Sequence, residues 1–573
     1  MERIGVFLCH CSLKAAGDIK VQQVIQSISR YDRVAYAIPY EDMCISSELE
    51  LVRDAIKKKR LDGIVLTSCS PSLHLECFRN VIVSEGLSTY QLEVAGLKEG
   101  GDWNLSEVEA TQRVIQTIKA SIDRLQHQSH VSPSYIPITK RALVIGGGIA
   151  GIQTALDIAD GGYEVLLVEK TSSIGGHMIQ YSEVFPTLDC PQCIETPKMV
   201  ECWQNPNIEI LAYSEVEEIS GEIGNFTVKI RKKASYVDWT KCNGCGLCIQ
   251  KCLTQVPADY DRLPFGHRKA IYVPFAQAVP NKPIIDRENC GYFTTGTCQV
   301  CSKICPREAI DYFQKDTFID INVGAIILAT GFELMSKKEI SEYDDDLDII
   351  DGIQFERLLA PGGPTAGEVL RPSDGKTPRE VVFISCVGSR DPEHFYPYCS
   401  KVCCMYLAKM AMLYKHAVPD GQAYIFYIDI RSTGKGYEEF IQRAVEEDHV
   451  VYLRGRVSRL FRENDKIKVY GVDTLSGRTI VIDADLVVLG MAMVPSLKGT
   501  ELIKKLNLKT DKFGFLSESH FKMRPMESLK PGIFIAGTSQ SPKDIPDTVA
   551  QASAAASKVL ILFAQEMVIQ EYA

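Results

Sequence analysis

A chain of 573 residues is too long for one hydrophobic core, and its length predicts about three or four domains. Its formal net charge of -10 comes from interspersed acids and bases, which argues against nucleic acid as a partner. The N-terminus does not resemble a signal peptide, and no apolar stretch is long enough to span a bilayer, so we expect a soluble, cytoplasmic protein. Twenty cysteines at short spacings in such a chain indicate metal or iron–sulfur ligation rather than disulfides.

Residues 1–130 predict a small α/β domain without a glycine fingerprint. Expected strands at 4–8, 34–38 and 63–66 alternate with expected helices at 21–29, 47–58 and 107–124. Cys9, Cys11, Cys44 and Cys69 come where these strands end, and carboxyl ends of strands are where open α/β sheets bind ligands. The four cysteines are therefore candidate ligands of one iron–sulfur centre; the alternative is that some are small buried hydrophobic residues.

Residues 141–170 follow a polar connector and carry a dinucleotide-binding pattern. After an expected strand at 142–145, Gly146, Gly148 and Gly151 fit G-x-G-x-x-G, and a helical pattern covers 152–160. A second strand, 164–168, delivers Glu169 where it can accept a hydrogen bond from a ribose hydroxyl. We assign this part, 140–235, to an FAD-binding domain, an ordinary glycine-rich turn being the alternative. The same site is expected to include Ala150, Lys170 and Gly176.

Cys190 and Cys193 form a single C-x-x-C pair after the dinucleotide turn. Such a pair is ambiguous between a redox dithiol, a pair of metal ligands and neither. Cys202, further along the chain, is expected to be a packed cysteine.

Residues 236–315 carry the most specific pattern, two ferredoxin-like cysteine runs. The fourth cysteine of each run normally ligates the cluster of the other run. One expected [4Fe–4S] centre has Cys242, Cys245, Cys248 and Cys305; the other has Cys252, Cys290, Cys298 and Cys301. A seven-residue gap opens the second run, which we interpret as a loop insertion at 294–297. Zinc is the alternative, and the absence of histidine from both runs argues against it.

The FAD-binding fold is expected to resume at 316–375 and again at 496–573. An apolar strand at 323–333 includes the turn Ala329-Thr330-Gly331, and near the C-terminus a strand leads to a turn at Gly537. A helix from Thr548 follows, and its N-terminal amides would face flavin oxygens. Thr330, Gly331, Gly537 and Asp544 are the cofactor-binding candidates of these parts.

Residues 376–495 predict a second Rossmann-like domain, with strands at 380–386 and 423–430. Only Gly388 stands where a glycine fingerprint is needed, so the usual nicotinamide site is expected to be lost. A C-x12-C-x3-C-C array enters a helical segment at 403–414, and three of its cysteines are expected within one helical turn. These candidate ligands of a further cluster are Cys386, Cys399, Cys403 and Cys404. Lys409 lies in the same helix, where its charge could reach a flavin or a cluster; an ordinary surface lysine is the alternative.

The order of CHC, TSCSPSLH, GGGIAG, FPTLDCPQC, two ferredoxin runs and SCVGSRD with C-x12-C-x3-CC resembles the A-type subunit of heterodisulfide reductase over essentially the whole chain. The resemblance implies an α/β fold: a thioredoxin-reductase-like FAD domain of two Rossmann-like subdomains, an inserted bis-[4Fe–4S] ferredoxin domain and the N-terminal α/β domain. It also implies Lys409 and Glu356 near the flavin ring. Many members carry a further ferredoxin domain, whereas this sequence stops at Ala573. The electron entry or exit route that such a domain would provide is therefore left unassigned.

The implied activity is that of an oxidoreductase subunit in which FAD takes two electrons, one-electron clusters divide them, and a lysine beside a carboxylate tunes the flavin. Implied partners are B- and C-type subunits, ferredoxin and an electron-input subunit using hydrogen, formate or a deazaflavin, in a dimer of complexes with flavin-based electron bifurcation. Alternatives are a related subunit of a benzoyl-CoA reductase or quinone-interacting complex, a stand-alone NAD(P)H-dependent flavoenzyme, and a non-catalytic scaffold.

Overall fold

The computed structural model describes residues 3–15, 19–40, 46–68, 71–97, 106–127, 134–343 and 345–570, so Cys44 and Cys69 lie outside the described residues. The chain divides into two compact units, residues 1–136 with 569–573, and residues 137–568. None of the described helices is both long and apolar enough to cross a membrane.

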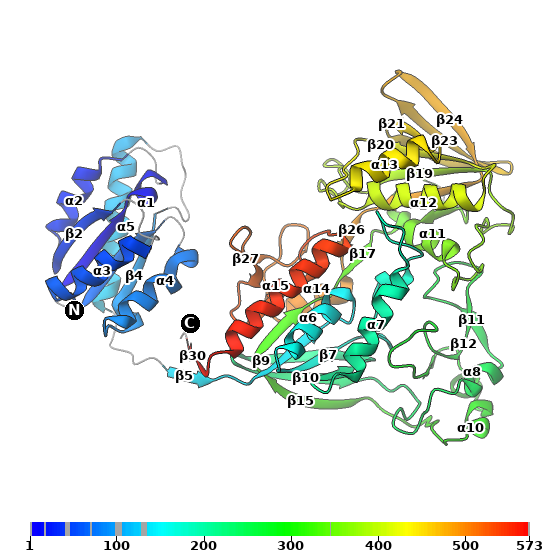
Figure 1. Cartoon of the computed structure of the whole chain (residues 1–573), viewed down its shortest axis with the longest axis horizontal. Coiled ribbons are helices and arrows are strands. Elements are labelled where there is room, and N and C mark those ends of the chain that lie inside the picture. The colour runs from blue at the N-terminus through cyan, green and yellow to red at the C-terminus, as the bar shows by residue number, and fades with distance from the viewer. Residues whose placement is uncertain are drawn as a thin grey trace. The chain divides into compact units, whose positions relative to one another are not determined.

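The first unit is a four-stranded parallel sheet in the order β2-β1-β3-β4 with helices on both faces (Figure 1). Its strands are β1 (Ile4–Cys9), β2 (Val34–Tyr40), β3 (Gly63–Ser68) and β4 (Leu92–Gly96). Its helices are α1 (His10–Ala15), α2 (Val21–Ser29), α3 (Ser46–Lys59), α4 (Pro71–Ser84) and α5 (Glu107–His127). The expected strands and helices are confirmed, because β1 and β3 are apolar and fully buried while α2 and α5 each bury one apolar stripe.

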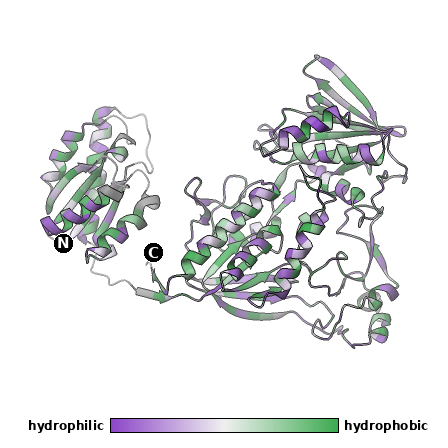
Figure 2. Ribbon diagram, in the orientation of Figure 1, coloured by the Kyte–Doolittle hydropathy of each residue, from purple (hydrophilic) through white to green (hydrophobic). Residues whose placement is uncertain are grey.

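The second unit is built on a seven-stranded sheet in the order β27-β28-β29-β16-β6-β7-β8, which is parallel from β29 to β8 and antiparallel on either side of β28. Its strands are β6 (Arg141–Ile145), β7 (Glu164–Val168), β8 (Ile208–Leu211), β16 (Ala325–Leu328), β27 (Glu518–His520), β28 (Arg524–Ser528) and β29 (Ile533–Ile535). The helices α6 (Ile149–Asp160) and α15 (Ile545–Phe563) pack side by side on it (Figure 1), and α7 (Pro191–Gln204) packs on α6. Hydrophobic residues concentrate in the strands (Figure 2).

Three expected boundaries around the seven-stranded sheet were wrong. The strand expected at 323–333 is broken at Gly324, where the chain bends and where an added Cβ would lie 2.2 Å from the Thr139 carbonyl oxygen. Its pieces are β15 (Thr317–Val323), β16 and β17 (Phe332–Leu334). Helix α6 begins at Ile149 rather than 152, next to the cap residue Gly148. Helix α15 begins at Ile545 rather than 548, because Asp544 caps it.

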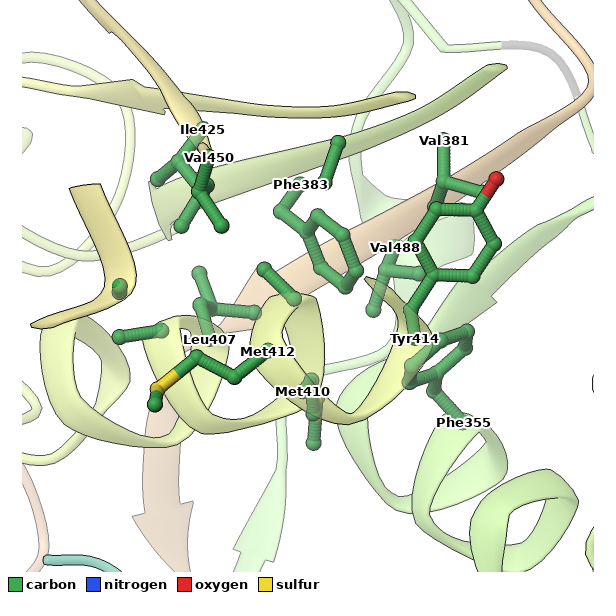
Figure 3. Packing of buried hydrophobic residues seen from close by; sticks show 14 of the residues in the cluster. Phe355, Val381, Phe383, Leu407, Met410, Met412, Tyr414, Ile425, Val450 and Val488 are labelled. Atoms are coloured by element: carbon green, nitrogen blue, oxygen red, sulfur yellow. The ribbon is translucent and has the colours of Figure 1, made fainter. Parts of the chain in front are cut away.

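A second, five-stranded parallel sheet has the order β18-β25-β19-β20-β21. Its strands are β18 (Ile349–Asp351), β19 (Glu380–Val387), β20 (Gln422–Tyr427), β21 (Val451–Arg454) and β25 (Leu486–Met491). Helices α11 (Gly352–Leu359), α12 (Cys403–Ala417) and α13 (Tyr437–Glu446) accompany this sheet. Figure 3 shows Leu407 and Tyr414 of α12 packed with Phe383 and Val488. The strand expected at 423–430 ends early, at the last pair with β21, Tyr427 opposite Arg454.

Antiparallel strands complete the second unit. One sheet joins β15 to β10 (Asn225–Lys232) and β9 (Ser214–Glu222); another joins β22 (Val457–Glu463), β23 (Lys466–Asp473) and β24 (Arg478–Ala484). Strand β17 pairs with β26 (Met493–Pro495), which precedes α14 (Leu497–Lys505). Two further strands, β5 (Ser134–Pro137) and β30 (Met567–Gln570), pair with each other where the chain passes from one unit to the other.

The segment between β10 and β15 holds short elements around a small core that includes Cys248, Cys290 and Cys301. Its elements are α8 (Leu247–Lys251), β11 (Gln255–Pro257), β12 (His267–Lys269), β13 (Ile271–Tyr272), β14 (Ile284–Ile285), α9 (Gly291–Thr295) and α10 (Val300–Ile304). The loop expected at 294–297 is partly helical, because α9 continues to Thr295 and ends at Gly296, whose φ is +75°.

Candidate functional site

A cavity of about 690 Å³ lies at the carboxyl ends of β6, β7 and β16, within the size range of ligand sites. Its wall contains most of the expected cofactor residues: Gly146, Gly148, Ala150, Glu169, Lys170, Gly176, Thr330, Gly331 and Asp544. Gly151 and Gly537 are not among the described lining residues. Gly151 has a packing role, because an added Cβ would lie 1.8 Å from the Gly146 carbonyl oxygen. Gly537 lies beside the cavity, since its neighbours Ala536 and Thr538 line it.

The turn between β6 and α6 forms a cradle that only glycine can build. Gly146 has φ +112°, and an added Cβ would lie 2.2 Å from the Ala329 carbonyl oxygen. A Cβ on Gly176 would lie 2.8 Å from the Cα of Gly148, so two glycine backbones face each other across the turn. The first turn of α6, capped by Gly148, borders the cavity, and amides at a helix N-terminus bind anions. These residues fit the pyrophosphate of a dinucleotide.

Glu169, at the end of β7, is fixed in place by three donors. Its Oε2 accepts from the Gly147 backbone N–H at 2.7 Å, and its Oε1 accepts from the N–H and the hydroxyl of Thr171, both at 2.8 Å. The side chain is largely buried yet borders the cavity. A carboxylate held this way can accept further hydrogen bonds from ribose hydroxyls.

Lys543 lies in the cavity wall just before α15 and was not expected from the sequence. Its ammonium donates to Gln540 Oε1 at 2.9 Å and to Ser541 Oγ at 2.8 Å. Burial, with nearby Lys401, lowers the pKa of Lys543 to about 8. A cationic side chain beside a helix N-terminus adds to the attraction of the cavity for a negatively charged ligand. In the sequence, only the position of Lys543 next to the N-cap residue of α15 could have suggested this role.

Lys409 and Glu356 form a buried ion pair behind the cavity wall. Lys409 is 2% exposed; its Nζ contacts Glu356 Oε1 and donates to the Glu183 carbonyl at 2.7 Å. Glu356 Oε2 accepts from the N–H and hydroxyl of Ser182, at 3.0 and 2.7 Å. The described residues that line the cavity do not include either member of the pair, but Tyr181 does line it, and Lys409 Nζ lies 6.0 Å from the Tyr181 ring centroid.

Glu195, on α7, is a second residue that sequence reasoning missed. It is fully buried, and neither carboxylate oxygen has a hydrogen-bond partner within the described part of the chain. Burial raises its pKa well above the ordinary value, which favours the protonated, neutral form of the side chain. Two tyrosines that line the cavity, Tyr181 and Tyr260, lie close enough for a charge on Glu195 to raise the pKa of their hydroxyls.

Four of the ferredoxin-like cysteines surround one cavity of about 330 Å³: Cys242, Cys245, Cys248 and Cys305. Backbone N–H groups of Gly244 and Ala309 donate to the sulfurs of Cys242 and Cys305, both at 3.4 Å. Hydrogen bonds of this kind tune thiolate ligands of iron–sulfur clusters. The donors and the shape of this cavity fit the first expected centre.

The second set begins with Cys252, which ends α8, and Cys290, which precedes α9. Cys298 lies close to Cys290, because a Cβ on Gly291 would lie 3.1 Å from the Cβ of Cys298. Burial and neighbouring thiols, including Cys252, raise the pKa of Cys290 and of Cys301. Four crowded thiols favour deprotonation only beside a positive centre such as cluster iron, so this set also fits a cluster.

The array of the second Rossmann-like domain lies at the carboxyl end of β19. Cys386 has φ +61° and lies within hydrogen-bond reach of Cys403, which in turn bonds Cys404. Cys403 and Cys404 open α12, whereas Cys399 precedes the helix, so the expectation of three cysteines in one helical turn was wrong. The Lys401 N–H donates to Cys399 Sγ at 3.3 Å. The chain turns back through Lys401, whose φ is +64°, before the helix begins.

In the N-terminal unit, Cys9 and Cys11 approach each other with their sulfurs 2.8 Å apart. The Cys9 backbone N–H donates to Thr67 Oγ1 at 2.8 Å, which ties β1 to the end of β3. Across the described residues of the chain, no three His, Cys, Asp or Glu side chains are placed to hold a single metal ion.

A family model for NAD(P)-binding Rossmann-like domains matches residues 144–195. The chain is 41% identical over 565 residues to the A-type subunit of the H(2):CoB-CoM heterodisulfide,ferredoxin reductase of Methanothermobacter thermautotrophicus, covering 98% of this chain and 85% of that one. It is 43% identical over 569 residues to the A-type iron-sulfur subunit of the CoB–CoM heterodisulfide reductase of Methanocaldococcus jannaschii, covering 98% and 86%. The chain belongs to the family of heterodisulfide reductase A-type subunits. It is therefore part of an oxidoreductase, which the resemblance implied.

Among solved structures, thioredoxin reductase from T. acidophilum covers 74% of this chain and 100% of its own, at 13% identity and a TM-score of 0.42. The α/β fold of this member of the heterodisulfide reductase family is shown by its own sheets, a four-stranded and a five-stranded parallel sheet and a mostly parallel seven-stranded sheet.

Proposed function

We propose that the chain is the FAD- and [4Fe–4S]-binding, electron-transferring subunit of a heterodisulfide reductase-type complex. The observation that carries this proposal is the course of helix α12. It begins with Cys403 and Cys404 of the array and carries Lys409, which lies behind the cavity wall. Five or six helical residues span about 8–9 Å, so the array and the cavity are connected by one short, buried element.

Bound in the cavity, FAD would supply acceptance and release of electron pairs, and clusters held by the cysteine sets would carry single electrons. The chain's own residues would hold and orient the cofactor. The glycine cradle and the start of α6 would bind the pyrophosphate, while Glu169 would orient the ribose. The Lys409–Glu356 pair fixes residues 182–183 through three hydrogen bonds and so positions Tyr181 in the cavity wall.

The partners that we propose are B- and C-type subunits, ferredoxin, and an electron-input subunit that uses hydrogen, formate or a deazaflavin, in a cytoplasmic dimer of complexes. Names of relatives support this choice. One from Methanococcus maripaludis is named for an H(2)/formate:CoB-CoM heterodisulfide,ferredoxin reductase, and one from Methanosarcina acetivorans for a ferredoxin/F(420)H(2)-dependent CoB-CoM heterodisulfide reductase. We propose bifurcation of electrons at the flavin, with disulfide cleavage on another subunit.

Anaerobic purification of the native complex, with flavin, iron, acid-labile sulfide and co-purifying subunits measured together, tests the proposal. We expect FAD, iron and sulfide for about three or four [4Fe–4S] clusters, and the partner subunits. Iron near zero, or bleaching of the flavin by NADH or NADPH alone, would overturn it, because the first result leaves no relay and the second indicates a stand-alone flavoenzyme.

A further inference from the structure

Cys190 and Cys193 belong to none of the four cysteine sets described above, and they lie together at the start of α7. Cys190 is the N-cap residue, and its Sγ accepts a hydrogen bond from the Cys193 backbone N–H at 3.3 Å. The Cys193 thiol also hydrogen-bonds to Cys190. Two hydrogen-bonded cysteines three residues apart at the start of a helix have the C-x-x-C arrangement of redox-active dithiols.

The pair is accessible, unlike the other cysteine of the same helix. Cys193 is exposed and Cys190 is half-buried. Cys202 is 0% exposed, its thiol donates to the Ile152 carbonyl at 3.8 Å, and burial raises its pKa to about 12. Helix α7 therefore carries one inert, packed cysteine and one pair that a reagent can reach.

Hydrogen bonds fix the segments on either side of Cys190. The Val184 N–H donates to the Asp189 carbonyl at 2.9 Å, which closes the loop that leads into Cys190. Gln192, between the two cysteines, donates from its Nε2 to the Ile179 carbonyl at 3.3 Å, in the turn that lines the flavin cavity. The two sulfurs are thus held in one position relative to each other, which favours thiol–disulfide exchange over ligation of a large cluster.

We propose that Cys190 and Cys193 are a redox-active dithiol that exchanges electrons with an external disulfide. The Cys190 thiolate, which accepts two hydrogen bonds from Cys193, attacks one sulfur of that disulfide; the disulfide bond breaks and one thiol leaves. The Cys193 thiolate then attacks Cys190 Sγ, the mixed disulfide breaks, and the second thiol leaves. The chain's two thiols lose two electrons and two protons, and the external disulfide gains them. This activity is separate from the proposed relay of FAD and clusters.

The test uses the full-length, cluster-containing protein, reduced and kept anaerobic. Glutathione disulfide is the small-molecule probe and insulin is the protein-disulfide probe. After each incubation, free thiols are blocked with N-ethylmaleimide at acid pH and the digest is measured by mass spectrometry. The tryptic peptide of residues 171–198 holds Cys190, Cys193 and no other cysteine. We expect this peptide to lose two hydrogens and to escape blocking with at least one probe, and the probe that reacts identifies the class of disulfide.

Three variants sharpen the test. C193S should retain a mixed disulfide with glutathione at Cys190, C190S should lose it, and C202S should behave as the wild type. The iron content of C190S and C193S should equal that of the wild type. Full blocking of both thiols after either probe, or a loss of iron in these two variants, would overturn the proposal, because the pair would then be inert or a set of metal ligands.

Discussion

Lys409 and Glu356 are each 2% exposed and form an ion pair, and Lys409 Nζ lies 6.0 Å from the ring centroid of Tyr181, which lines the flavin cavity. A charge in a buried ion pair becomes strongly destabilising when its partner is removed. The pair joins α12, which begins at the cysteine array, to α11 and to the segment that leads into Cys190. It therefore links the helix that begins at the cysteine array to residues 182–183, which follow Tyr181 of the cavity wall.

Removing one member of this pair should cost more than removing both. K409A leaves the Glu356 carboxylate buried without its cation, which typically costs about 3–5 kcal/mol. We expect the melting temperature of the anaerobic holoprotein to fall most in K409A and to recover partly in K409M/E356Q, with FAD retained in both. The flavin reduction potential should also shift in K409A. An unchanged potential in a folded K409A variant would contradict the role of Lys409 near the flavin.

The glycine cradle predicts a selective loss of FAD in G146A. An added Cβ would meet the Ala329 carbonyl oxygen at 2.2 Å, and a positive φ costs alanine about 1–2 kcal/mol. The matched control is G162A, also at a positive φ of +84°, where an added Cβ meets no described atom within 4 Å. We expect G146A to lose FAD and keep its iron, and G162A to keep both, measured by flavin and iron content. Equal FAD content in the two variants would contradict the assignment of the cavity.

Lys543 predicts that FAD affinity depends on pH. Its pKa of about 8 leaves the side chain charged below pH 8 and neutral above it, so its attraction for the negatively charged FAD is lost as pH rises through that value. In K543M, FAD should bind about tenfold more weakly at pH 7, the cost of about one charged hydrogen bond, with a Kd that is flat from pH 7 to 9. K498M, at an exposed lysine of the same wall, is the control. The measurement is reconstitution of the apoprotein with FAD; the same pH profile in K543M and wild type would exclude this role.

Glu195 predicts a pH-dependent stability that E195Q removes. The folded pKa is raised, so the folded state keeps a proton that the unfolded state, with a pKa of about 4.3, releases. The stability contributed by this group is therefore present at low pH and is lost as pH rises. We expect the melting temperature of E195Q to rise relative to that of the wild type as the pH increases above about 4.3, whereas the melting temperature of E201Q, on the exposed face of α7, should follow that of the wild type. Parallel melting curves for E195Q and wild type would argue against a buried neutral acid.

Spacing along the chain was enough to predict most of the strands and the glycine turn, because these depend on local geometry. The ferredoxin-like order of the two runs, and not local geometry, predicted that Cys305 lies with Cys242, Cys245 and Cys248 around one cavity. Gly324 shows where local patterns fail: the expected strand is broken there, where the chain approaches the distant Thr139 carbonyl. Lys543 and Glu195 were missed for a related reason. Their pKa values depend on burial and on partners brought by other elements, which no local pattern records.

The rate at which reduced ferredoxin bleaches the bound flavin, in wild type and in C403S, tests the central claim most directly. Cys403 is buried among Cys386 and Cys404 at the start of α12, so its loss should disrupt the array while FAD stays in its cavity. C202S, in which a packed cysteine is replaced on α7, is the control. We predict rapid bleaching in wild type and C202S, and little bleaching in C403S at equal FAD content. Equally rapid bleaching in C403S would contradict an electron route through the array.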